Sequence, residues 1–329
     1  MDKVTELGGG LFQVRVPLPF PLKWVNAYAM EDASGWTVID PGLRTPDAEQ
    51  TWAEALNRIG IVWSDIQRIM LTHHHPDHYG LAGWLQQRAG DAQVWMSQTS
   101  YEQADTLWGA QTETTTEALS RLFAMHGFPQ QEQDAMRRHS ADFIALVSPQ
   151  PRGVRFIEYG ERIAMGGLEY EALHTPGHAF GHVSFLHRES GTIFCGDHVL
   201  PGISPNIALL PFGDRNPLGS YISSVSEAAQ SFSVVKALPG HREPFTQYRE
   251  RCEELLRHHV ERLAKMASML HRRAMTGYEL CCELFGRTLS VHQLRFALSE
   301  TIAHLVYLEE EGTIRRQTDD LGVVSYRTI

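Results

Sequence analysis

Four histidines and an aspartate crowd into six consecutive positions near the start of this chain. The stretch LTHHHPDHYG, residues 71–80, contains His73, His74, His75, Asp77 and His78. Buried imidazole nitrogens need partners, so this crowding is costly unless an electron-poor group binds the rings. In an extended backbone His73 and His75 point the same way and His74 the other way, for which we expect a structural role. The stretch is either an exposed polar turn or half of a metal site.

Three later segments place further donors in turns that follow predicted strands. His178 lies in HTPGHAFGH, Asp197 in FCGDHVL and His241 in ALPGHREP. One loop carries too few donors to surround two metal ions. Donors from several strand ends would therefore have to meet to form such a site. Neutral imidazole and carboxylate both suit Zn²⁺, and a site built from them can leave each ion an open position.

The elements that would carry these donors alternate between strands and helices. Strand patterns occupy residues 12–16, 25–30, 36–39, 66–71, 93–96, 154–158, 163–165, 168–173, 183–186, 192–194 and 233–237, and helical patterns occupy residues 46–59 and 81–88. Residues 100–146 are helical throughout, with one polar and one apolar face. This alternation predicts an α/β sandwich with a helical insert mounted over one edge.

The end of the chain has a different character. From about residue 250 it is almost all helical, and two capping boxes, Thr276 to Glu279 and Ser290 to Gln293, each precede an apolar helical pattern. A hairpin pattern closes the chain. We therefore expect residues 1–245 to form the main domain, with 100–146 as its insert, and residues 246–329 to form a helical, winged-helix-like domain.

Together these segments resemble the metallo-β-lactamase-fold superfamily. Residues 72–80 match its H-x-H-x-D-H signature, and the segments at 176–178, 196–197 and 239–241 follow in the family's order. The sequence IDPG at 39–42 is similar to the family's early aspartate turn. The match covers residues 10–245 and implies an αββα sandwich. GDHVLPGISPN and the tail resemble the subgroup with a C-terminal winged helix, the lactamase-β-like hydrolases.

The resemblance implies a ligand set for two Zn²⁺ ions, although other divalent transition metals fit the same donors. His73, His75 and His178 would hold one ion, Asp77, His78 and His241 the other, and Asp197 would bridge them. Two ions roughly 3.5–4 Å apart can share one water and lower its pKa to roughly 7, which supplies a hydroxide nucleophile. Asp77 would help to move a proton to the leaving group. Asp40 would orient a ligand histidine, and His182 would support the ligands from behind.

The substrate is less well specified than the site. An insert over the metals would limit the pocket, which favours a small ester, thioester or lactone as the substrate. A metal-dependent endoribonuclease or phosphodiesterase is the first alternative, and an iron-dependent redox enzyme on the same fold is the second. Nucleic acid is disfavoured because the net charge is −10 and residues 251–329 carry equal numbers of basic and acidic residues. The tail is more typical of packing on the parent domain or of self-association into a homodimer.

The composition of the chain indicates the class of protein and the cellular location to expect. The 329 residues are 43% hydrophobic and 21% charged, an ordinary globular balance. No signal-peptide pattern and no long uncharged apolar stretch is present, so we expect a soluble, cytoplasmic protein without a membrane partner. The four cysteines form no C-x-x-C pair and are expected to be reduced.

Several polar residues outside the ligand set are expected to play structural roles. Cys195 is predicted to be a buried thiol at the end of a strand. His174 is interpreted as a packing or supporting residue, and His198 either lines the pocket or is structural. His258 and His259 lie in a helical pattern that predicts a solvated face.

Overall fold

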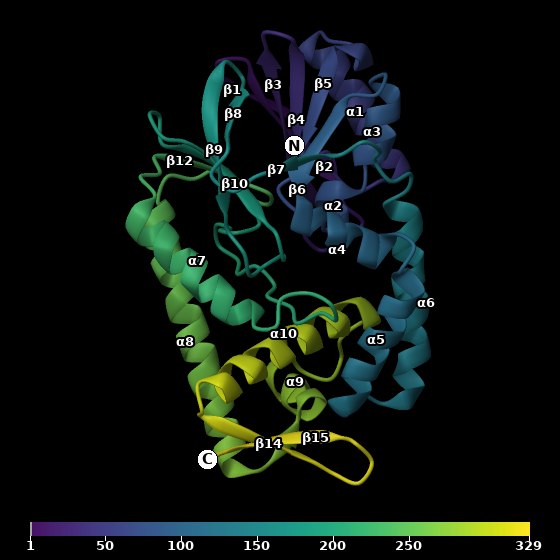
Figure 1. Ribbon diagram of the computed structural model, residues 1–329, viewed down its shortest axis with the longest axis vertical. Helices are drawn as coiled ribbons and strands as arrows, with labels where there is room; N and C mark the ends of the chain where they lie inside the picture. Colours follow the sequence, from purple (N-terminus) through teal and green to yellow (C-terminus); the bar gives the residue numbers. More distant parts are fainter. Residues whose placement is uncertain (1) are drawn as a thin grey trace.

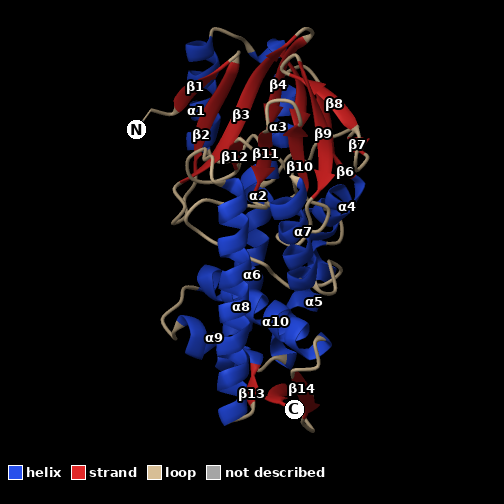
Figure 2. Ribbon diagram, turned by 90° about the vertical axis from the view of Figure 1, so that its left-hand side faces the viewer, coloured by secondary structure: helices blue, strands red, loops and turns tan. Residues whose placement is uncertain are grey.

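Two stacked β-sheets occupy one end of the molecule and a mostly helical body the other (Figures 1 and 2). The computed structural model describes residues 2–329 and their side chains, except the side chains of residues 139–142. The larger sheet contains, in spatial order, β1 (Val4–Gly8), β2 (Leu11–Pro17), β3 (Trp24–Asp32), β4 (Gly35–Ile39), β5 (Ile66–Met70), β6 (Gln93–Ser97) and β7 (Arg155–Ile157). The smaller sheet contains β12 (Lys236–Pro239), β11 (Thr192–Gly196), β10 (Val183–His187), β9 (Leu168–His174) and β8 (Arg162–Met165).

Helices cover the outer face of each sheet. Helices α1 (Pro46–Ile59) and α3 (Ala82–Arg88) share a hydrophobic cluster with the larger sheet, and α7 (Pro217–Ser231) and α8 (Tyr248–Arg272) share one with the smaller sheet. A third cluster, which includes Met70 and Phe185, fills the space between the sheets. Each such large side chain, when fully buried, contributes roughly 1.5–3 kcal/mol. The layers are helix, sheet, sheet and helix, which confirms the predicted αββα sandwich.

Local sequence signals explain where helices such as α1 begin and end. The Thr45 side chain accepts a hydrogen bond from the Ala48 amide, Pro46 occupies the first turn, and Gly60 ends the helix with a φ of 87°. Trp52 and Leu56 lie four residues apart on the same face and are buried against the larger sheet. A short 3₁₀ turn, Trp63–Asp65, then leads into β5.

Strand direction brings the loops that carry the candidate ligands to one edge of the sandwich. Strands β4 to β7 are parallel to one another. Strand β11 is parallel to β12, and β9 runs in the same direction because β9 and β11 both pair antiparallel with β10. The loops after β4 and β5 therefore leave the larger sheet at the same edge. The loops after β9, β11 and β12 likewise leave the smaller sheet at one edge. After β5 the chain forms a single helical turn, α2 (Pro76–Tyr79).

The predicted insert and the C-terminal segment form one helical body (Figure 1). Its elements are α4 (Gln98–Trp108), α5 (Thr112–Met125), α6 (Gln130–Leu146), α9 (Gly277–Phe285), α10 (Val291–Glu310) and a small sheet of β13 (Met275–Thr276), β15 (Val324–Thr328) and β14 (Ile314–Thr318). One hydrophobic cluster joins Leu119 and Phe123 of α5 to Leu298 and Ile302 of α10. Both predicted capping boxes are present, at the starts of α9 and α10. The insert therefore depends on the C-terminal helices to bury its apolar face.

Strand β1 and helix α7 are among the elements that were absent from the sequence-based expectation. Strand β1 is short and lies at the edge of its sheet. Helix α7 is rich in serine and contains Gly219, both weak helix formers, although Asn216 caps it and Pro217 occupies its first turn. The strand expected over 233–237 begins only at Lys236. Within residues 2–329, no helix combines the length and the apolar character needed to cross a bilayer.

Candidate metal centre

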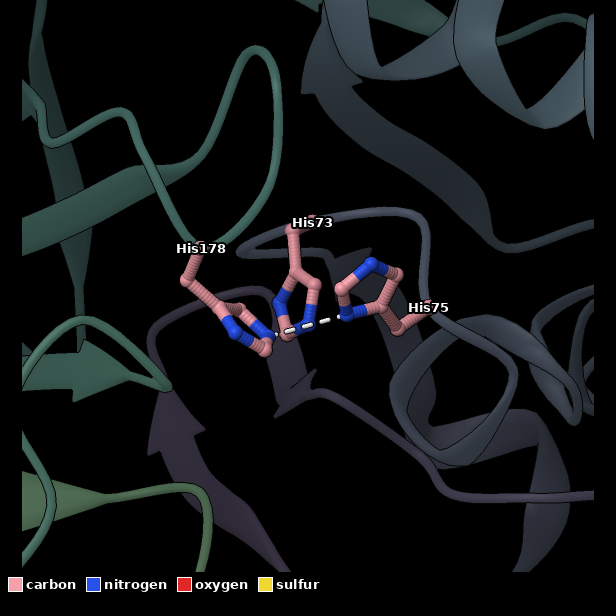
Figure 3. A group of neighbouring side chains, drawn as sticks. All are labelled: His73, His75 and His178. Carbon is pink, nitrogen blue, oxygen red and sulfur yellow. Dashed lines mark hydrogen bonds between the residues drawn. The ribbon is translucent and has the colours of Figure 1, made fainter. Parts of the chain in front are cut away.

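Two triads of side chains converge at the carboxyl-end edge of the sandwich. His73, His75 and His178 form one triad, whose donor atoms all lie within 4.8 Å of one another (Figure 3). In that triad Nδ1 of His75 lies 2.9 Å from Nε2 of His178. The second triad, Asp77, His78 and His241, meets the same distance limit. The structure thus brings together the loops after β5, β9 and β12.

Asp197 lies between the two triads. Its Oδ2 is 3.5 Å from Nε2 of His178 in the first triad and 3.4 Å from Nε2 of His241 in the second. Its Oδ1 is 3.4 Å from Nε2 of His78. A carboxylate in this position can contact cations held by either triad, which is the position that the resemblance implies for a bridging ligand.

The ring orientation of two of these histidines is fixed by Asp40 and Thr72. Nδ1 of His78 lies 2.8 Å from Oδ2 of Asp40. Thr72 donates its hydroxyl hydrogen to the same carboxylate, so its oxygen is free to accept a hydrogen bond from Nδ1 of His73 at 2.9 Å. With their Nδ1 atoms protonated in this way, both rings present the lone pair of Nε2 to the centre.

Backbone carbonyls orient two further rings in the same sense. Nδ1 of His178 lies 2.9 Å from the carbonyl oxygen of Asn206, and Nδ1 of His241 lies 3.0 Å from that of Trp24. A carbonyl oxygen can only accept, so both Nδ1 atoms must donate. Four imidazoles therefore direct Nε2 towards one region, where each offers a lone pair once that nitrogen is unprotonated.

The inward-facing atoms lack partners, which tests whether a cation fits here. Nε2 of His73, His78 and His241 and Oδ1 of Asp197 are buried and have no hydrogen-bond partner among the described residues. Buried polar atoms are almost always paired, and several unpaired acceptors that face one another repel. A divalent cation would satisfy all of them at once, so the residues present fit a metal centre.

Protonation in the metal-free protein follows the position of the carboxylates. Burial lowers the pKa of His73 well below its ordinary value, and the neighbouring His78 and His75 lower it further. Burial acts in the same sense on His241, but Asp197 and Asp77 outweigh it and raise its pKa to about 10. Without a metal, protons on the rings beside the carboxylates compensate the acidic charge, and a cation would displace them.

Both carboxylate oxygens of Asp40 are engaged in hydrogen bonds within the chain. It follows β4 with a φ of 50°, a left-handed conformation that aspartate tolerates better than most residues. Its Oδ1 accepts from the amide of Thr72, and its Oδ2 accepts from the Thr72 hydroxyl and from His78. Asp40, His73 and His78 are close enough to form a third ligand group, but both oxygens of Asp40 are already engaged.

The remaining polar residues of the motifs surround the triads. His182 is fully buried, with its ring centroid 5.0 Å from that of His73 and its Nδ1 2.8 Å from the Thr175 hydroxyl. Its supporting role stays a prediction. His74 is buried, and its carbonyl accepts a hydrogen bond from the indole of Trp108 on α4. Cys195 is a buried thiol, as predicted.

Three histidines outside the triads have different surroundings. His198 is buried, with Nε2 3.0 Å from the Ser224 hydroxyl. His174 is exposed and stacks on Tyr159 with 4.0 Å between the ring centroids. The prediction of a solvated face was wrong for His259, which is fully buried with Nδ1 3.2 Å from Nε2 of His304. That face of α8 is covered by α10, a contact between distant segments that a helical pattern alone does not reveal.

Comparison with known proteins identifies the family. A profile described as the metallo-beta-lactamase superfamily matches residues 24–242, a span that includes both triads. The chain belongs to the metallo-beta-lactamase superfamily. A second profile, described as the metallo-beta-lactamase-like C-terminal domain, matches residues 263–329.

Individual relatives of the chain include metallo-hydrolases and members of the same family. The probable metallo-hydrolase YqjP of Bacillus subtilis (strain 168) is 29% identical over 307 residues, or 92% of each chain. The hydroxyacylglutathione hydrolase GloC of Haemophilus influenzae is 27% identical over 172 residues, which cover 52% of this chain and 65% of that one. The crystal structure of the metallo-beta-lactamase family protein TTHA1429 from Thermus thermophilus is 33% identical, with a TM-score of 0.86 over 98% of this chain and 100% of that chain. The chain is a metallo-hydrolase of this superfamily, with His/Asp clusters that could hold divalent metal.

Apart from Asp40, reasoning from sequence missed the groups that hydrogen-bond to the rings. Thr72 precedes the signature motif and acts through both its amide and its hydroxyl. The carbonyls of Trp24 and Asn206 carry no side-chain signal at all. Only the fold brings these groups next to the histidines.

Proposed function

We propose that this chain is a dinuclear zinc hydrolase that acts on a small ester, thioester or lactone. The observation that carries the proposal is the pair of triads joined by Asp197, with four imidazole Nε2 atoms directed at the same region. His73, His75 and His178 would hold one ion, and Asp77, His78 and His241 the other. Imidazole and carboxylate donors suit zinc, and a dinuclear site matches the donor count.

The residues of the chain would divide the work of hydrolysis among them. Bound zinc supplies a water of lowered pKa and a Lewis acid for the substrate oxygen. Asp77 is the most accessible carboxylate of the group, with 22% of its side chain exposed against 8% for Asp197. Its Oδ2 lies 3.1 Å from Nε2 of His241. From this position Asp77 would accept a proton at its carboxylate and pass it to the leaving group.

The thioester version of the substrate has support from a relative. GloC is named for hydrolysis of a hydroxyacylglutathione, a thioester, and it matches 52% of this chain. The relation covers too little of either chain to carry the glutathione moiety over. We therefore propose the bond type, a small acyl ester or thioester, and leave the leaving group open.

Phosphodiester cleavage is the second candidate, and charge disfavours it. The net charge is −10, and residues 251–329 contribute no excess of basic residues to attract phosphates. A protein that bound RNA backbone in several places would need such an excess. Zinc-dependent RNA cleavage at physiological salt would nevertheless favour this candidate over the first.

A substrate panel with one catalytic variant tests the proposal. Thioesters, lactones, phosphodiesters and single-stranded RNA are each offered to the zinc-loaded protein and to Asp77→Asn. We expect hydrolysis of at least one acyl substrate and a loss of roughly 10²- to 10⁴-fold in Asp77→Asn, the range typical of an acid–base residue. Activity only on RNA would replace the first proposal with the second. An iron-loaded protein that oxidises thiols and hydrolyses nothing would contradict both.

A further inference from the structure

Arg295 lies on α10 between two contacts that this helix makes with segments of the metallo-beta-lactamase domain. Three residues before it, His292 stacks on Phe20 with 4.8 Å between the ring centroids. Four residues after it, the carbonyl of Ser299 accepts a hydrogen bond from the Leu209 amide at 3.1 Å. Residues three and four apart share one side of a helix, so Arg295 lies between these two contacts.

The segments that α10 contacts on this face are the ones that orient two histidines of the triads. The segment with Phe20 continues to Trp24, whose carbonyl accepts from His241. The segment with Leu209 begins at Asn206, whose carbonyl accepts from His178. The side-chain amide of Asn206 also lies 3.3 Å from the carbonyl of Phe296 on α10. Arg295 is therefore flanked by one segment from each triad, and Figure 1 shows α10 crossing the molecule between α8 and the α5–α6 pair.

Arg295 is a partly buried cation without a counterion. No hydrogen bond, ion pair or aromatic contact engages its guanidinium among the described residues. Burial lowers the pKa of this group to about 10, and no acidic neighbour among the described side chains opposes that shift. Arg262, by contrast, lies 3.4 Å from Glu300. Leaving a desolvated cation unpaired costs stability, so this position favours a role that a partner outside the chain completes.

We propose that Arg295 binds an anionic group, a carboxylate or a phosphate, on the substrate of the metal centre. The guanidinium would make a bidentate pair with that group and hold the scissile bond against the triads. The proposal rests on the proposed acyl hydrolase and narrows its substrate class to anionic esters and thioesters. It also gives the C-terminal domain a part in binding substrate.

Two thioesters that differ only in charge test the proposal by kinetics. 3-(Acetylthio)propanoate and its neutral amide have the same scissile bond, so the metal chemistry is common to both. We expect Arg295→Gln to raise KM for the carboxylate by roughly 10- to 100-fold, the loss of a charge-assisted pair, and to leave the amide unchanged. Arg295→Lys should restore part of the difference. The matched control is Arg287→Gln, an exposed position in the same domain. Equal effects on both substrates would overturn the proposal.

A binding measurement keeps this test separate from the hydrolase proposal. Malonate and inorganic phosphate are titrated calorimetrically into the zinc-loaded wild type, Arg295→Gln and Arg287→Gln. We expect the wild type and Arg287→Gln to bind at least one anion and Arg295→Gln to lose that binding, and the anion that binds distinguishes carboxylate from phosphate. If the wild type hydrolyses neither thioester but this pattern holds, the acyl hydrolase fails and the anion site stands. Equal anion binding by Arg295→Gln and wild type would overturn the anion site even if both thioesters are hydrolysed.

Discussion

The carboxylate of Asp40 and the imidazole of His78 form a buried hydrogen bond, with 2.8 Å between Oδ2 and Nδ1. This bond determines which nitrogen of His78 carries its proton and leaves Nε2 to face Asp77 and Asp197. The same carboxylate also positions Thr72, which in turn orients His73. Asp40, which belongs to neither triad, thus fixes the ring orientation of one histidine in each triad, directly for His78 and through Thr72 for His73.

Replacing Asp40 should weaken metal binding without removing a ligand. In Asp40→Asn, the amide nitrogen can only donate, so it would favour the His78 tautomer that is protonated on Nε2. We expect zinc affinity to fall by roughly 10- to 100-fold, the usual effect of losing such a partner. Competition with a chromophoric chelator measures it. Asp47→Asn, an exposed change at the start of α1, serves as the control. Unchanged affinity in Asp40→Asn would contradict the orienting role.

Because Gly240 has no side chain, Asp197 and His78 can pack directly against its backbone. A Cβ at this position would overlap Oδ1 of Asp197 and lie 2.5 Å from Cε1 of His78. Gly240→Ala should therefore displace both side chains and lower the zinc content of the purified protein. Gly213→Ala is the matched control, because a Cβ there would meet only ordinary contacts. Elemental analysis that finds the same zinc content in both variants would show that the site tolerates the displacement.

Zinc should stabilise the protein more strongly as the pH rises. Asp197 and the neighbouring carboxylates outweigh burial and raise the pKa of His78 and His241, that of His241 to about 10. In the metal-free protein the stability from these protonated rings is fully present below about pH 6.5 and is lost as the pH rises towards about 10. Zinc must displace those protons to bind. At higher pH fewer protons are bound, so zinc binds more tightly.

Thermal unfolding of zinc-loaded and metal-free protein measures this effect. The difference between the two Tm values should grow between about pH 6 and about pH 9. Calorimetric titration in buffers of different ionisation enthalpy should also show proton release when zinc binds at neutral pH. A Tm difference that stays constant over this interval would mean that His78 and His241 are already neutral in the metal-free protein, which would contradict the account.

The cluster shared by the insert and the C-terminal helices should make them unfold together. Leu298 of α10 is fully buried in that cluster, against residues from α5 and α6. Leu298→Ala should cost roughly 2–5 kcal/mol of unfolding free energy through lost burial and a cavity. Val260→Ala, at a position that is 64% exposed, should change it by less than about 0.5 kcal/mol. Hydrogen exchange should speed up in α5, α6 and α10 alike, and faster exchange in α10 alone would show that they are independent units.

The convergence of the candidate ligands could be predicted from the sequence because each donor follows a strand in a distinctive turn. Their role as metal ligands stays a prediction. His73 and His75 have the two-residue spacing of an extended segment, and His178 and His241 each follow Pro-Gly. Helix α1 could be predicted because its cap, its apolar spacing and its final glycine all agree. These signals are local in sequence, and α1 forms over the residues for which they predict a helix.

What could not be predicted depends on contacts between distant segments. The polar pattern around His259 is that of an exposed face, yet α10 covers it and places His304 beside it. Arg295 has the pattern of an ordinary helix residue, and only the positions of Phe20 and Leu209 show where it lies. The division at residue 245 stays a prediction, and the hydrophobic clusters of α5 and α7 both include residues that follow it. Cytoplasmic location and self-association stay predictions.

A zinc-loaded crystal with anomalous diffraction at the zinc edge is the most direct test of the central claim. We expect two zinc peaks per chain, roughly 3.5–4 Å apart, one at His73, His75 and His178 and the other at Asp77, His78 and His241, with Asp197 between them. A single iron, or triads that bind no metal while zinc sits elsewhere on the chain, would contradict the claim.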